Sequence, residues 1–184
     1  MEIKGTAVKP TKVFVKDKFS NRYIEWLNSL SENSRNIMTD NILISMWYPI
    51  KDAFIEPTQK VCELFYNGNT IGAKELGMYS ADIGLKGVYK IFVRIGSPKF
   101  LLKRASMIFS TYYSQSEIEL IEISDNKAIM HISKFPEPHE LIDLRICGWI
   151  ERALEISGCR NVKIDITKSL AKGDKLTEFV SEWK

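Results

Sequence analysis

The sequence is poor in histidine and cysteine, and it lacks long apolar runs. Its three cysteines are widely separated and form no CxxC pair, which is typical of reduced thiols rather than of a disulfide or zinc site. The longest apolar runs, Ile42 to Ile50 and Val88 to Ile95, are short or interrupted by charge, so no membrane span is expected. The first twelve residues have no signal-peptide core. We therefore expect a cytoplasmic protein.

The sequence also lacks a strong excess of charge of either sign. The formal net charge is +3, from 26 basic and 23 acidic residues. The densest basic cluster, Lys99, Lys103 and Arg104, fits one solvated helix face, so nucleic acid is not an expected partner. Gly84 and Gly87 are not followed by GK[ST], which excludes a phosphate-binding loop of that kind.

The length and composition indicate one globular domain. The chain has 184 residues, of which 45% are hydrophobic and 27% are charged, enough to bury a core without disulfide or metal staples. We expect a single domain over residues 1–184, with a helical portion over about 1–113 and a sheet portion over about 114–184.

Helical periodicity dominates the first portion. Apolar residues recur at intervals of three and four in several segments separated by Ser, Asn and Gly. The expected helices are Thr11 to Phe19, Arg22 to Leu30, Glu32 to Met38, Ile50 to Phe65, Thr70 to Ile95 and Lys99 to Tyr113. Gly72, Gly77, Gly84 and Gly87 are unfavourable inside a helix, so we expect close approach of another helix or a ligand there, or a kink near Gly84.

Strand patterns dominate the second portion. Glu117 to Ile123 and Lys127 to Ser133 flank a short turn and predict a hairpin. A helix is expected from His139 to Ser157, then strands around Val162 to Ile166 and from Lys175 to Trp183. The fold class is therefore α+β, with N-terminal and central helices packed on a mostly antiparallel four-stranded sheet and β-β-α-β-β order in the C-terminal half.

Several short motifs carry a family resemblance. They are Trp47-Tyr48-Pro49, the segments Gly72 to Gly77 and Ala81 to Pro98, Leu102 to Ala105, and Tyr112-Tyr113. With them the chain resembles an uncharacterised bacterial family, the Myxococcus-type paralogous family. That family looks like part of a wider superfamily that includes vinyl-reductase-type domains, haem-based nitric-oxide sensor domains and TRAPP-type tethering subunits. The resemblance implies helices on an antiparallel sheet, often with an apolar ligand or acyl chain between the layers.

Two of these relatives have chemistry that this chain does not match. The vinyl-reductase-type domains often carry cysteines near a late Gly-Asp turn, whereas this chain has none after Cys159. A haem sensor needs an axial histidine on a helix. His131 is expected in a strand and His139 directly after a Pro-rich turn, so we expect neither a haem motif nor any other cofactor or metal.

An aromatic set with interleaved arginines is the strongest positive signal for a site. Apolar pockets with a few polar anchors are how small-molecule sites are usually built, although core packing explains the same residues. The candidate ligand-binding residues are Trp47, Tyr79, Tyr89, Phe92, Arg104, Tyr112 and Trp149.

No catalytic constellation is evident. Cys147 and His131 are the residues on which an enzyme would depend, and an inert core thiol and a structural strand histidine explain them more simply. Three hypotheses stay open. The first is a non-enzymatic domain that binds or senses an apolar or amphipathic small molecule. The second is a protein-interaction module that forms a homodimer, and the third is an enzyme.

Overall fold

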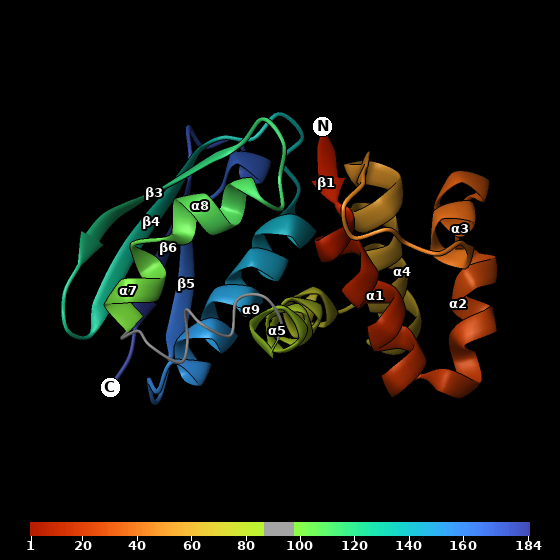
Figure 1. The fold of residues 1–184 in the computed structure, drawn as a ribbon, viewed down its shortest axis with the longest axis horizontal. Helices are drawn as coiled ribbons and strands as arrows, with labels where there is room; N and C mark the ends of the chain where they lie inside the picture. Colours follow the sequence, from red (N-terminus) through yellow and green to blue (C-terminus); the bar gives the residue numbers. More distant parts are fainter. Residues whose placement is uncertain (87–97) are drawn as a thin grey trace.

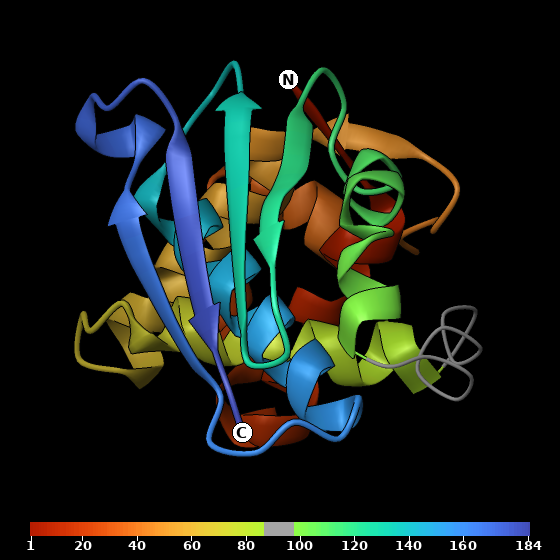
Figure 2. The same ribbon diagram turned by 90° about the vertical axis from the view of Figure 1, so that its left-hand side faces the viewer.

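A computed structural model describes residues 1–86 and 98–184. Within them the chain folds into helices packed on one face of a four-stranded antiparallel sheet, which confirms the expected α+β class (Figures 1 and 2). The end of the helix expected from Thr70 to Ile95 lies outside the described residues, as do Tyr89 and Phe92. None of the described helices combines the length and the apolar character needed to cross a membrane.

The first portion begins with a short strand and a set of helices. The three predicted helices of this region are confirmed, although the first begins earlier than expected. The pairing of β1 with β2, antiparallel, was not predicted. The elements are β1 (Glu2–Lys4), α1 (Gly5–Lys18), the 3-10 turn η1 (Ser20–Arg22), α2 (Tyr23–Ser29), α3 (Glu32–Thr39) and β2 (Trp47–Pro49).

The central helices line the space next to the sheet. They are the π-helical turn η2 (Lys51–Ile55), α4 (Glu56–Phe65), α5 (Ile71–Lys86), α7 (Pro98–Leu102) and α8 (Ala105–Ser110). The single helix expected from Lys99 to Tyr113 is wrong, because α7 ends in a tight turn. The Arg104 amide donates to the Leu101 carbonyl, three residues back, and Arg104 leaves helical geometry. The turn lets α7 and α8 bury separate apolar faces.

The sheet is formed by β3 (Glu117–Ile123), β4 (Lys127–Lys134), β5 (Lys163–Lys168) and β6 (Thr177–Glu182). The spatial order is β3-β4-β6-β5, with every neighbouring pair antiparallel. The predicted hairpin is confirmed, since the Ser124 amide donates to the Lys127 carbonyl at 2.8 Å. Along the sequence, α9 (Glu140–Ile156) follows β4 and precedes β5, and it lies behind the sheet (Figure 2).

Helices α5 and α9 pack tightly against each other beside the sheet (Figure 1). Two glycines permit the contact. A Cβ atom on Gly77 would lie 2.1 Å from the Arg145 carbonyl oxygen, and one on Gly148 would lie 2.0 Å from that of Lys74. The close helix approach expected at Gly77 is therefore confirmed. This crossing fixes where α9 presents its side chains.

Candidate functional site

A cavity of about 80 Å³ lies between the helices and the sheet. Its walls come from α5, α7, α8 and α9, with Ile118 of β3 and Met130 of β4 on the sheet side. Further residues come from α1 and η2, so segments from both portions of the chain line it. A space between the layers is where the resemblance placed a ligand.

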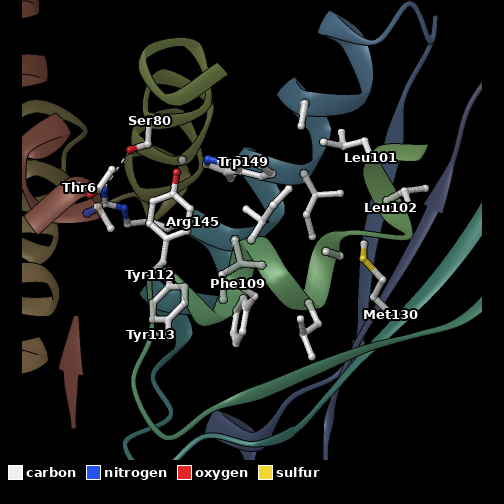
Figure 3. Close-up of a pocket in the computed structure, with 18 of the residues that line it drawn as sticks. Thr6, Ser80, Leu101, Leu102, Phe109, Tyr112, Tyr113, Met130, Arg145 and Trp149 are labelled. Atoms are coloured by element: carbon white, nitrogen blue, oxygen red, sulfur yellow. Dashed lines mark hydrogen bonds between the residues drawn. The ribbon is translucent and has the colours of Figure 1, made fainter. Parts of the chain in front are cut away.

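The cavity has two chemically different ends. Oxygen and nitrogen atoms gather at one end in Figure 3, whereas the other end presents carbon and one sulfur atom. The polar end consists of Ser80, Tyr112 and Arg145, and the apolar end of Leu101, Leu102 and Met130. Such an arrangement suits a molecule with a polar head and an apolar body.

Arg145 is held at the polar end by hydroxyl groups. Its Nη1 donates to Thr11 Oγ1 and to Thr58 Oγ1, both at 2.9 Å, and its Nη2 donates to Ser80 Oγ at 3.2 Å. The Phe54 ring covers one face of the guanidinium, with its centroid 3.6 Å from Cζ. Four helices, α1, α4, α5 and α9, thus meet at this one side chain.

The charge of Arg145 is buried, and no carboxylate in the described part of the chain pairs with it. The residue is 3% exposed, and it forms no ion pair with any carboxylate of the described residues. Residues 87–97 contain no Asp or Glu. Burial lowers the pKa of Arg145 to about 9, because desolvation disfavours the charged form. At neutral pH the guanidinium still carries its positive charge.

Two buried nitrogen donors beside the cavity have no acceptor among residues 1–86 and 98–184. They are Nε of Arg145 and Nε1 of Trp149. Both residues line the cavity and lie one turn apart on α9. The Trp149 ring nitrogen faces the polar end in Figure 3. Buried donors normally find partners, so each unsatisfied one requires an explanation.

The structure brings two of the predicted site residues together at the cavity. Tyr112 and Trp149 both line it, and their rings meet edge to face with centroids 6.3 Å apart. Tyr112 follows α8, whereas Trp149 is on α9. The aromatic signal in the sequence therefore indicated part of the wall.

The other predicted site residues lie elsewhere or outside the described part of the chain. Trp47 is on β2, where Lys4 Nζ lies 4.3 Å from its ring centroid. The Tyr79 hydroxyl donates to the Asp17 carboxylate, and the Arg104 guanidinium stacks 3.5 Å from the Phe100 ring centroid. These three do not line the cavity. Tyr89 and Phe92 lie outside the described residues.

The groups on which an enzyme would depend are occupied or inert. Burial raises the pKa of the Cys147 thiol to about 11, which disfavours the reactive thiolate. His131 on β4 is hydrogen-bonded to the Glu178 carboxylate, with 2.6 Å between Nε2 and Oε2. His139 caps α9 by accepting from the Leu141 amide. None of these three side chains lines the cavity.

Arg145 was missed in the sequence although a signal was present. The apolar stripe of the helix runs through Ile142, Ile146 and Trp149. Arg145 is three residues after Ile142 and four before Trp149, so it falls on the same face. A charged residue within an apolar stripe is the informative exception to the rule that charges lie outside.

Comparison with solved structures identifies the fold. An H-NOX protein from Shewanella oneidensis in the Fe(II)NO state superposes with a TM-score of 0.75 at 13% identity, covering 98% of this chain and 99% of that one. An Fe(II) unliganded H-NOX protein from K. algicida gives 0.73 at 10% identity, covering 98% and 96%. The chain has the H-NOX fold. No family model and no curated protein matches the sequence.

The cavity does not fit a haem. The chain has only two histidines, and neither lines the cavity. Tyr113 does line it, but burial raises the pKa of its hydroxyl, which opposes the tyrosinate that ligates haem iron in some proteins. The volume of about 80 Å³ is also below the roughly 150 Å³ that accommodates benzene. In the part of the chain that the structure describes, the cavity of this H-NOX fold is too small for a haem and no histidine lines it.

Proposed function

We propose that the chain is a non-enzymatic domain that binds or senses an apolar or amphipathic small molecule in the cavity between its helices and its sheet. The observation that carries the proposal is the cavity between the layers, with one polar and one apolar end. On this proposal Tyr112, Trp149 and Arg145, which all line the cavity, contact the ligand. The whole chain, residues 1–184, acts as one domain.

The size of the cavity restricts the ligand. A cavity of about 150 Å³ holds benzene, so the observed 80 Å³ takes a small group directly and a longer chain only if the walls move apart. The short helices α7 and α8 form one wall. A ligand with a short or slender apolar part is therefore favoured over a fused ring system.

Native mass spectrometry tests the proposal. The freshly purified chain, and the chain incubated with 1-hexanol or hexanoate, should show a bound molecule with at least one probe. Ala153→Phe should abolish binding, because Ala153 is buried in the cavity wall. Met107→Phe on the exposed side of α8 is the matched control. Absence of any bound molecule, or equal binding by Ala153→Phe, would overturn the proposal.

A second candidate function is a protein-interaction module that forms a homodimer. The observation in its favour is an exposed apolar segment between α3 and β2, where Leu43, Ile44 and Met46 are 52%, 56% and 52% exposed. Light scattering tests it. The proposal expects a dimer that Ile44→Ser dissociates, and a monomer at all accessible concentrations would contradict it.

We also retain, as proposals supported by the sequence resemblance, membership of the Myxococcus-type family and its link to the vinyl-reductase-type and TRAPP-type domains. A cytoplasmic location remains the expectation drawn from the cysteines. Fractionation of cells that express the chain tests the location directly.

A further inference from the structure

We infer, on the basis of the proposed function, that the ligand is a monocarboxylate whose carboxylate pairs with Arg145 and whose apolar part extends toward Leu102 and Met130. The three residues line one cavity, and Figure 3 shows Arg145 at the opposite end from the other two. The inference gives the ligand a charge and an orientation.

The first argument is the uncompensated charge. A buried arginine is normally paired with a carboxylate, because an isolated charge in the interior is strongly unfavourable. Arg145 has only the hydroxyl groups of Thr11, Thr58 and Ser80 as hydrogen-bond partners among the described residues. An anion in the cavity would supply the missing partner where the dielectric is low and the attraction is strong.

The second argument is the unused hydrogen-bonding capacity. A guanidinium has five N–H donors, and the three bonds to hydroxyl groups involve only Nη1 and Nη2. The Nε–H has no acceptor among residues 1–86 and 98–184, and neither has Trp149 Nε1–H. Guanidinium N–H groups match the oxygens of a carboxylate, and an indole N–H can donate to the same group.

The third argument concerns the number of charges. Arg145 is the single basic residue among the described residues that line the cavity. One positive charge balances a carboxylate, whereas a phosphate monoester carries close to two negative charges at neutral pH and would leave one uncompensated. The small volume also favours a compact planar head. A carboxylate is therefore the better match to this end of the cavity.

A purely structural role for Arg145 explains only part of the geometry. In a structural role, the side chain would link its own helix α9 to α1, α4 and α5 through three hydroxyl groups. A neutral amide or hydroxyl could make such links without burying a charge. A purely structural role does not account for Nε of Arg145 and Nε1 of Trp149, which have no acceptor among the described residues and belong to two residues that line the cavity. A bound carboxylate accounts for both features.

Isothermal titration calorimetry with butanoate, hexanoate and octanoate tests the inference, with hexanamide and 1-hexanol as neutral probes of similar shape. We expect hexanoate to bind the wild-type chain about tenfold to a hundredfold more tightly than either neutral probe, as for a charge-assisted hydrogen bond. Arg145→Met should remove this preference while keeping affinity for 1-hexanol, since the apolar end is unchanged. Arg145→Lys should retain part of the preference.

The outcomes separate the inference from the proposed function. Equal affinity of hexanoate and 1-hexanol for the wild-type chain would overturn the carboxylate and leave the binding function standing. Failure of every probe to bind would overturn both. If Arg145→Met does not fold, Trp149→Phe takes its place, because it removes a donor while retaining an aromatic ring. It should weaken hexanoate binding more than 1-hexanol binding, and an equal effect on both would count against the inference.

Discussion

The two ends of the cavity differ in the kind of side chain that they bury. At the apolar end, Leu101, Leu102 and Met130 are buried side chains of the kind that fills any core. At the polar end, Arg145 is equally buried but carries a charge without a carboxylate partner among the described residues. Burial of the first kind stabilises a fold, whereas burial of the second kind opposes it. On the proposed function, the polar end serves ligand binding and the apolar end serves both stability and fit.

The apolar end should show the largest loss of stability on truncation. Leu102→Ala should reduce the free energy of unfolding by about 3 kcal/mol, because it removes buried methyl groups and leaves a void. Leu102 is 3% exposed. Urea unfolding followed by circular dichroism measures this. Met107→Ala, at a position 49% exposed on the neighbouring helix, should change stability by less than about 0.5 kcal/mol. Equal losses would contradict the account of this end.

The contact between α5 and α9, which positions Arg145, should give the second largest loss of stability. Gly77→Ala should reduce stability by about 2 kcal/mol, because its Cβ would lie 2.1 Å from the Arg145 carbonyl oxygen and force α5 and α9 apart. The control is Gly84→Ala on the same helix, where the Cβ meets the Tyr112 hydroxyl oxygen at 3.2 Å. Alanine is the better helix former and the Tyr112 hydroxyl needs to move only slightly, so any loss there should be much smaller than at Gly77 in the same unfolding assay. A tolerated Gly77→Ala would show that the helices can separate without penalty.

The polar end should contribute little to the stability of the ligand-free chain. Arg145→Met should change the free energy of unfolding by no more than about 1 kcal/mol, because loss of three hydrogen bonds is offset by removal of a buried unpaired charge. Arg145 is nearly fully buried, so an ordinary core residue here would show a larger effect. Urea unfolding in ligand-free buffer is the measurement. A loss of about 3 kcal/mol or more would identify Arg145 as a structural strut.

The open face of the sheet provides a reference in which a charged group is fully partnered. Hydrogen bonds from Thr167 and His131 lower the pKa of Glu178 from 4.5 to about 2. A carboxyl whose pKa is lowered on folding contributes stability above pH 4.5 and loses it as the pH falls toward 2. Glu178→Gln should reduce the loss of unfolding free energy between pH 4.5 and pH 2 by less than about 1 kcal/mol, which is the size expected for an interaction near the surface.

Unfolding curves from pH 6 to about pH 2 would measure the contribution of Glu178. Glu182→Gln is the control, since Glu182 is an exposed residue on the same strand. Parallel pH profiles for Glu178→Gln and the wild-type chain would contradict the assigned role of Glu178.

Local sequence patterns predicted most of the helices and strands, but not the features that depend on contacts between distant segments. The hairpin of β3 and β4 followed from alternation and a short turn, and α9 followed from its apolar stripe. The break between α7 and α8 was missed because no Gly or Pro marks it, and β1 was missed because its partner β2 is distant in sequence. Such features depend on tertiary packing, which periodicity does not report.

The same reason explains why the residues that line the cavity were only partly predicted. Tyr112 and Trp149 were found because aromatic residues are recognisable candidates for a pocket wall. Arg145 was not, since its partners Thr11, Thr58 and Ser80 are 134, 87 and 65 residues away. Nothing local marks those hydroxyl groups as neighbours of one side chain. The charge within the stripe of α9 was the single sequence feature that pointed to it.

The tryptophan ring N–H groups offer the most direct test of the central claim that an anion binds at the polar end. In a ¹⁵N-labelled sample titrated with hexanoate, we expect the Trp149 Nε1–H resonance, assigned with Trp149→Phe, to shift strongly as it gains an acceptor. The Trp26 resonance should stay in place, because its Nε1 already donates to the Pro57 carbonyl at 3.2 Å. An unmoved Trp149 resonance at saturating hexanoate, or the same shift with 1-hexanol, would contradict the account.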